Sequence, residues 1–151
     1  MSEYVIRPLG AAMWDAFAHL AEKHNGVWNG CWCAVAWCEY GSPDELPSIY
    51  HLKEYNAGLD TAPDYRLTCF FVDRDHRRKG VAAVALRGAL DLIAEAGGGV
   101  VEAYPQDTLG TKTSGSFLYN GTRSLFEKAR FSYERPKGKN HCVMRRTVSP
   151  C

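Results

Sequence analysis

The clearest chemical signal in the sequence is the basic stretch at residues 72–82, VDRDHRRKGVA, which joins an apolar run to an amphipathic one. A helix that starts here leaves its first backbone N–H groups without partners, and the positive end of its dipole lies at the same place. Such an end binds phosphate when the backbone is accessible, as small residues at Gly80 and Ala82 allow. Arg74 and the run Arg77–Lys79 add positive charge. The stretch therefore predicts a phosphate or pyrophosphate site.

Three neighbouring segments must position this site. The nearly continuous apolar run Tyr65–Val72 predicts a strand covered on both faces. An apolar stripe predicts a helix over Lys79–Ala96, which Gly97–Gly99 ends. Val100–Tyr104 predicts a second strand. Strand, helix and strand in so short a segment predict a βαβ unit with parallel strands.

The rest of the chain contributes further elements to one α+β domain over residues 1–151 with a mixed β-sheet. Helices are expected at Ala12–Lys23, as a short helix or helical turn within Asp44–Asn56 interrupted at Pro47, and from Asn120 or Gly121 to about Arg130. Strands are expected at Tyr4–Arg7, Cys31–Tyr40, Phe131–Arg135 and His141–Val148, with a loop around Pro136–Asn140 before the last strand.

Composition narrows the environment and the partners. The chain has 151 residues, 46% hydrophobic residues and a net charge of +1, so we expect a real core and no nucleic-acid or membrane partner. No apolar run approaches the roughly 20 residues that span a bilayer. With no signal-peptide pattern at its start, we expect a cytoplasmic protein whose six cysteines are free, mostly buried thiols.

The spacing Arg77-x-x-Gly80-x-Ala82 resembles the Arg/Gln-x-x-Gly-x-Gly/Ala signature of the GNAT superfamily of N-acetyltransferases. The segment Leu125–Phe131, LFEKARF, is similar to the Leu-Tyr-Glu-Lys-x-Gly-Phe segment near the end of many members. The resemblance covers residues 65–148 well and residues 1–25 loosely. It looks closest to a bacterial branch with a Cys-Trp-Cys segment and a Pro-Asp-Glu-Leu-Pro segment.

This resemblance implies a GNAT-like fold that binds acetyl-CoA as co-substrate and transfers acetyl to a primary amine of a small molecule or a protein. A bulge in the first strand of the βαβ unit would aim an N–H at the thioester oxygen, and its two parallel strands would splay apart to admit the ligand. The strand residues implied to pair with the pantetheine arm are Phe70, Phe71 and Val72. The other implied cofactor-binding residues are Arg77, Arg78, Lys79, Gly80, Val81, Ala82 and Asn120. No metal is expected.

Acetyl transfer to an amine also needs proton transfer. Glu102 lies within an apolar strand, where a charge is costly, so it is either a base or amine anchor or a structural partner of an arginine. Glu39 is a second candidate base, whereas His76 fits the phosphate loop better. The usual acid of the family, a Tyr, is replaced by Phe126, so Tyr119 is the substitute candidate beside the alternative that no acid is needed.

Two features leave the function open. The side chains that could bind zinc are His24, Cys31, Cys33 and Cys38. Their spacing instead favours thiols buried among the neighbouring tryptophans. A third interpretation is that these tryptophans form an aromatic wall for a cationic amine. Only about 40 residues, 25–64, precede the predicted pantetheine strand, so the acceptor pocket is short and a second copy of the chain could complete it. A non-catalytic acyl-CoA-binding or interaction module is therefore the alternative to an active enzyme.

Overall fold

A computed structural model describes Ile6, Pro8 and residues 36–49, 51–72, 74–76, 79–107 and 121–151 of the chain, with only the backbone of Trp37, Phe71 and Arg74. Its elements are β1 (Ala36–Gly41), α2 (Leu52–Ala57), β2 (Tyr65–Val72), the 3₁₀ turn η2 (Arg74–His76), α3 (Val81–Glu95), β3 (Gly99–Ala103), α4 (Arg123–Lys128), β4 (Ser132–Lys137) and β5 (His141–Val148). The predicted α+β architecture is confirmed.

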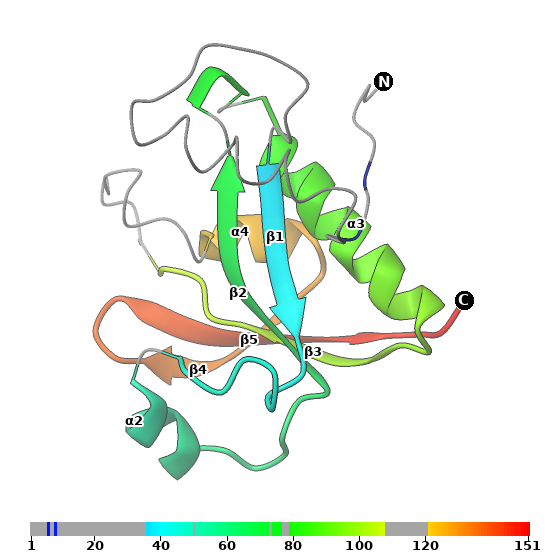
Figure 1. The fold of residues 1–151 in the computed structure, drawn as a ribbon. Helices are drawn as coiled ribbons and strands as arrows, with labels where there is room; N and C mark the ends of the chain where they lie inside the picture. The colour runs from blue at the N-terminus through cyan, green and yellow to red at the C-terminus, as the bar shows by residue number, and fades with distance from the viewer. Residues whose placement is uncertain are drawn as a thin grey trace.

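The described strands form one mixed sheet in the order β1-β2-β3-β5-β4 (Figure 1). β2 and β3 are its parallel pair and are joined through α3, so the predicted βαβ unit is confirmed. The other neighbouring strands pair antiparallel. The long helix α3 runs beside β1 and β2 in Figure 1, and in the chain it follows β2 through the turn η2.

The predicted boundaries are most accurate where the hydrophobic pattern is strongest. β2 and β5 span the predicted residues, and β3 is shifted by one residue to Gly99–Ala103. α3 begins two residues later than expected because its N-cap, Gly80, has a left-handed backbone with φ of 75°. The predicted end is confirmed, since Gly98 N donates to Ile93 O at 2.8 Å beyond the last turn.

Other boundaries differ from the prediction for local reasons. The helix expected from Asn120 or Gly121 starts at Arg123, because Thr122 caps it by accepting from Leu125 N at 3.4 Å. β4 continues through Pro136, which lacks an N–H but is tolerated because β4 is an edge strand of the described sheet.

The helix expected within Asp44–Asn56 lies later, at Leu52–Ala57. A turn precedes it, in which Leu46 N donates to Ser42 O at 2.9 Å, and Pro47 follows that turn. The proline fixes its own φ and disfavours the helical region for the preceding residue, so a helix cannot run on through it.

Part of the predicted N-terminal half lies outside the described residues, including the helix at Ala12–Lys23 and residues 31–35 of the long strand. Ile6 is described and is not in a strand; its side chain instead lies against α3, where a Cβ on Gly88 would meet Ile6 Cγ2 at 2.4 Å. None of the helices in the described ranges is long and apolar enough to cross a membrane.

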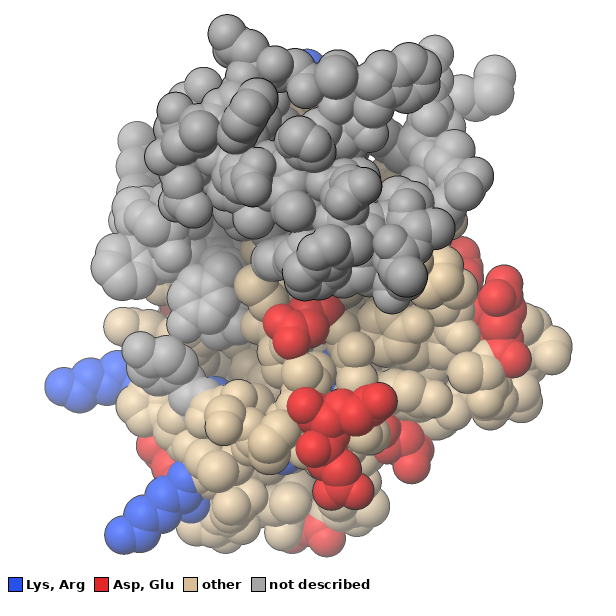
Figure 2. Space-filling view, in the orientation of Figure 1, with Lys and Arg blue, Asp and Glu red and all other residues tan. Residues whose placement is uncertain are grey.

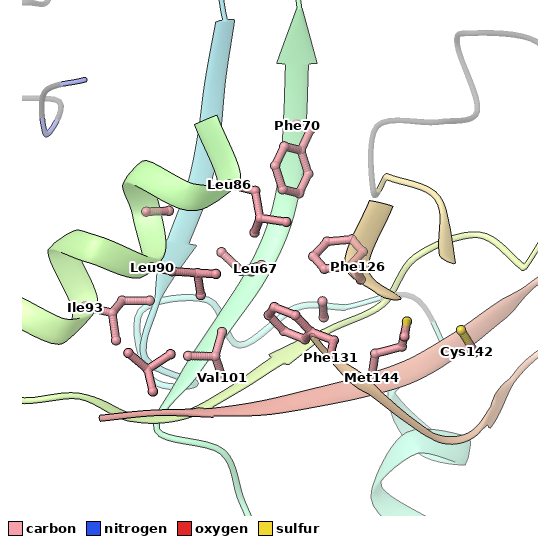
Figure 3. Close-up of a cluster of buried hydrophobic side chains, with 13 residues drawn as sticks. Leu67, Phe70, Leu86, Leu90, Ile93, Val101, Phe126, Phe131, Cys142 and Met144 are labelled. Atoms are coloured by element: carbon pink, nitrogen blue, oxygen red, sulfur yellow. The ribbon is translucent and has the colours of Figure 1, made fainter. Parts of the chain in front are cut away.

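The main core lies between the sheet and the helices α3 and α4 (Figure 3). Leu86, Leu90 and Ile93 project from α3 toward Leu67 and Val101 of the sheet. Further members come from β2, α4 and β5 and the residue before β4, and include Phe70, Phe126, Phe131, Cys142 and Met144. This core fixes the start of α3 relative to β2, the two elements that form the candidate site.

The opposite face of the sheet is partly covered by the short helix α2. Tyr55 is the buried residue of α2, and its ring meets that of Tyr104 edge to face, with 5.5 Å between the centroids. Together with Val143 they form a second, smaller cluster. Glu102 and Arg66 are register partners on neighbouring strands and are both buried.

Candidate functional site

The candidate site is the wedge where β2 and β3 separate. The two strands pair at only three positions, of which Leu67 with Ala103 is the last. β3 then ends, whereas β2 continues to Val72 with β1 on its other side. Figure 1 shows the upper part of β2 rising away from β3. The divergence expected of these strands is therefore present, and it leaves the β3 side of Thr68–Val72 without a strand neighbour among the described residues.

A β-bulge lies at the start of this stretch. Glu39 of β1 pairs with Cys69 and the next residue, Tyr40, pairs with Leu67, so Thr68 is the extra residue. A bulge interrupts the ladder and redirects the backbone groups around it. The Thr68 hydroxyl is buried and has no hydrogen-bond partner. The bulge and an unsatisfied hydroxyl thus meet where the wedge opens.

The start of α3 has the properties of an anion site. No side chain caps it, and in the described part of the chain no hydrogen bond occupies the backbone N–H groups of Gly80, Val81, Ala82 or Ala83. A Cβ on Gly80 would have no heavy atom within 4 Å, so the space in front of the glycine is open. The Lys79 side chain is exposed. The helix dipole and the open backbone can together accept a phosphate group.

The remaining cofactor residues are located in part. Phe70 is buried, with its ring 5.7 Å from that of Phe126, and Val72 is half-buried. Phe71 is described through its backbone in β2. Arg77, Arg78 and Asn120 lie outside the described residues, so their roles stay predictions.

His76 lies in η2, between β2 and α3. Its Nδ1 atom is buried and has no hydrogen-bond partner among the residues that the structure describes. The nitrogen is therefore available to a group that enters beside the loop, which is consistent with a place in the phosphate loop.

Glu102 is held in a buried ion pair. The residue is 0% exposed, and its Oε2 atom accepts from Arg145 Nε at 2.5 Å. Its other oxygen accepts from the Tyr104 hydroxyl at 2.9 Å. The arginine partner that the sequence offered as one alternative is thus present, and both oxygens are occupied. A role for Glu102 as base or amine anchor stays a prediction.

Sequence reasoning missed the polar cluster that surrounds this pair beneath α2. Lys137 is 1% exposed and its Nζ lies 4.9 Å from the centroid of the Tyr104 ring. Burial lowers the pKa of Lys137 to about 8. Arg66 donates to Leu46 O at 2.7 Å and lies over the Tyr55 ring, while its Nε atom is buried without a partner. Like Glu102, Arg66 is a charged residue within an apolar run of the sequence. This pattern could have predicted that Arg66 is buried in a polar cluster.

The two tyrosines of this cluster are poor proton donors at neutral pH. Burial raises the pKa of Tyr104, and the neighbouring Glu102 carboxylate raises it further. Burial also raises the pKa of Tyr55, whose hydroxyl is buried and makes no hydrogen bond of standard geometry. The cluster therefore contains buried charged and hydrogen-bonding groups, and neither of its tyrosines is suited to protonate a thiolate.

The other acid and base candidates lie apart from the wedge or outside the described residues. Glu39 is exposed on β1, on the side of β2 away from β3. Tyr119 lies outside the described ranges. Phe126, at the position of the usual acid, is 0% exposed and contacts the rings of Phe70 and Phe131, so it serves the core.

The described cysteines are free thiols. Cys142 is buried, Cys38 and Cys69 are half-buried, and Cys151 is exposed. Burial, with Cys69 and Glu39 nearby, raises the pKa of Cys38, so its thiol stays protonated. His24, Cys31 and Cys33 lie outside the described residues, so the zinc alternative stays untested, as does the tryptophan wall.

The surface charge is uneven on the face drawn in Figure 2. Below the grey part, acidic side chains are spread over the middle and the right, with basic side chains at the left margin. Exposed acidic residues of the described chain include Glu39, Asp44, Glu45, Asp60 and Asp64. Such a face attracts cations rather than polyanions.

No protein-family model matches the chain, and no curated protein matches it significantly. Among solved structures, the crystal structure of the ribosomal-protein-S18-alanine N-acetyltransferase from Escherichia coli is similar over 77% of this chain and 96% of that chain, with 13% sequence identity and a TM-score of 0.42. With an identity this low, the function has to be argued from the site.

Proposed function

We propose that the protein is a GNAT-type N-acetyltransferase that transfers the acetyl group of acetyl-CoA to a primary amine of a small molecule or a protein. The observation that carries this proposal is the run Thr68–Val72. It continues past the last parallel pair, begins with a bulge and leads to the uncapped start of α3. This arrangement offers a strand edge to an extended arm and a helix end to a diphosphate, the two parts of CoA.

Different parts of this chain bind the diphosphate, the pantetheine arm and the thioester. The amides from Gly80 to Ala83 hold phosphate oxygens, and Lys79 adds charge beside them. The edge of β2 beyond Leu67 orients the pantetheine arm, and the N–H groups around Thr68 polarise the thioester carbonyl. Attack of the neutral amine on that carbonyl forms the amide bond and expels the CoA thiolate. The amine proton leaves to a base, for which Glu39 and Glu102 are the candidates.

A second function is favoured by specific observations. Glu102 has both oxygens engaged and Phe126 replaces the usual acid within the core, so the described residues offer no free buried base or acid at the wedge. A non-catalytic acyl-CoA-binding or interaction module of the same fold would need neither group. The two functions share the cofactor site and differ in turnover.

Two measurements separate these functions. Calorimetric titration with acetyl-CoA tests the shared site, and release of free CoA thiol over a panel of small amines and amine-bearing peptides tests transfer. We expect binding and release with at least one amine. Binding without release on any amine would support the module, and absence of binding would overturn both.

A further inference from the structure

A second candidate site is a groove at the opposite end of β3 from the wedge. It has a volume of about 520 Å³ and lies beside the last residues of β5, with Val100 and Thr147 in its lining. Within the described ranges, three arginines and one carboxylate, Glu134, line it. The arginines are Arg130, Arg145 and Arg146.

The three arginines differ in the hydrogen bonds and ion pairs that they make within the protein. Arg145 is neutralised by Glu102 and also donates to Thr61 O. Arg146 donates one bond, from Nη1 to Ala129 O at 2.9 Å, which leaves its other donors available. Arg130 is exposed and makes no side-chain hydrogen bond or ion pair to any residue in the described ranges. The groove therefore has an excess of positive charge with free guanidinium donors.

The backbone of Arg130 lies in the left-handed region at the end of α4. α4 ends with Phe131 N donating to Phe126 O and Arg130 N donating to Glu127 O, and α3 ends with the same two bonds through Gly98 and Gly97. This closing motif needs a left-handed residue at its second-last position, normally glycine. α3 uses Gly97, with φ of 114°, whereas α4 uses Arg130, with φ of 66°. Arg130 therefore adopts this backbone at a cost that glycine would not have, and the closed end of α4 sets where its side chain begins beside the groove.

The groove also contains a free strand edge. β4 begins at Ser132, which pairs with Arg145, so Arg146–Val148 have no β4 partner. On their other side these residues pair with β3. No backbone hydrogen bond from another described residue covers their open side. Such an edge can accept an extended peptide as an added strand.

We propose that this groove binds an acidic segment of a partner protein, extended along Arg146–Val148, with its carboxylates on Arg130 and Arg146. A peptide fits better than a nucleic acid for two reasons. The described residues that line the groove include no aromatic side chain on which bases could stack, and its strand edge matches a peptide backbone. This inference goes beyond the proposed acetyl transfer and does not depend on it.

Fluorescence anisotropy with the full chain tests the proposal. The probe is a fluorescein-labelled octapeptide of alternating Glu and Thr, which places all glutamates on one side of a strand. A Glu–Pro octapeptide keeps the charge but lacks alternate N–H groups, and a Lys–Thr octapeptide reverses the charge. We expect the Glu–Thr peptide to bind, the Glu–Pro peptide to bind about tenfold more weakly or worse, and the Lys–Thr peptide not to bind.

Variants assign the binding to the groove. The variants Arg130→Gly and Arg146→Gln are each expected to weaken binding of the Glu–Thr peptide about tenfold, because each removes one charged hydrogen bond. Because glycine suits the backbone at position 130, this variant should fold at least as well as the parent. Lys139→Ala removes an exposed charge elsewhere and should leave affinity unchanged.

Three results would overturn the proposal. They are unchanged affinity in both arginine variants, equal binding of the Glu–Pro peptide, and tighter binding of a single-stranded oligonucleotide of the same length. None of them bears on acetyl-CoA binding, so failure here is distinct from failure of the proposed function.

Discussion

The Glu102 carboxylate and the Arg145 guanidinium meet at 2.5 Å between register partners of β3 and β5, and Glu102 is fully buried while the Arg145 side chain is 18% exposed. The pair lies on the face of the sheet that α2 partly covers. Tyr104 donates to the second carboxylate oxygen, so each oxygen of Glu102 accepts a hydrogen bond.

Removing one partner should cost far more than removing both. Glu102→Gln leaves Arg145 without its countercharge in a largely buried place, and we expect a loss of about 2–4 kcal/mol in the free energy of unfolding. The double variant Glu102→Leu with Arg145→Met should lose less than the sum of its single variants. Urea denaturation of the parent, Glu102→Leu, Arg145→Met and the double variant measures the coupling. Additive losses would show that the two groups do not stabilise each other.

Gly80 and Gly97 provide a matched test of the cofactor site. Both have positive φ, and a Cβ on either would meet no atom within 4 Å. Gly80→Ala and Gly97→Ala should therefore each cost about 1 kcal/mol of stability through backbone strain. Only Gly80→Ala should also weaken acetyl-CoA in calorimetry, because only that Cβ stands where the phosphates bind. Equal affinities in the two variants would exclude the start of α3 as the binding site.

Lys137 should make stability depend on pH in the alkaline range. Its folded pKa is about 8 and its ordinary value is 10.5, so between these values the unfolded chain holds a proton that the folded chain has lost. Stability then rises with pH across this window, by up to about 3 kcal/mol at its upper end, and shows no such dependence below pH 8.

The variant Lys137→Met isolates this effect from titrating cysteines and tyrosines. The difference in free energy of unfolding between the parent and this variant should shrink from pH 8 to pH 9.5, with the variant more stable at pH 7. Lys139→Met, in the exposed turn, should show a constant difference. A constant difference for Lys137→Met as well would mean that its ammonium stays hydrated.

The left-handed residue at the end of α4 gives a stability prediction separate from peptide binding. Arg130→Gly should raise the free energy of unfolding by about 1 kcal/mol, because glycine adopts this backbone without a Cβ clash. The converse change at the end of α3, Gly97→Arg, should lower it by a similar amount. Thermal unfolding of both variants checks the pair, and destabilisation by Arg130→Gly would show that the arginine side chain itself supports the fold.

Local patterns predicted the elements that carry the candidate cofactor site. The apolar run at Tyr65–Val72 and the stripe that ends at Gly97 are continuous enough to define β2 and α3. The predicted start of α3 is two residues too early. Gly80 could lie inside the helix or cap it, and its φ decides between the two. The residue types around it predict an anion site at the start of α3, and this site stays a prediction.

The polar cluster under α2 could not be assembled from the sequence. Tyr55, Arg66 and Lys137 come from α2, β2 and β4, and their contacts depend on the strand order. Lysine after a proline also looks exposed in a sequence, whereas Lys137 is 1% exposed. The arginine pair of Glu102 was considered, but its identity as Arg145 required the register of β3 with β5.

The short parallel ladder between β2 and β3 has a mechanical consequence. Three residue pairs join β1 and β2 to the other three strands, so this seam is the narrowest hydrogen-bonded link within the described sheet. A ligand bound there would contact both β2 and β3. It would extend the link between the two parts of the sheet beyond the pair Leu67 and Ala103. Amide protons of Thr68–Val72 should then exchange more slowly with solvent in the loaded protein than in the empty one, with the rest of the sheet following to a lesser degree.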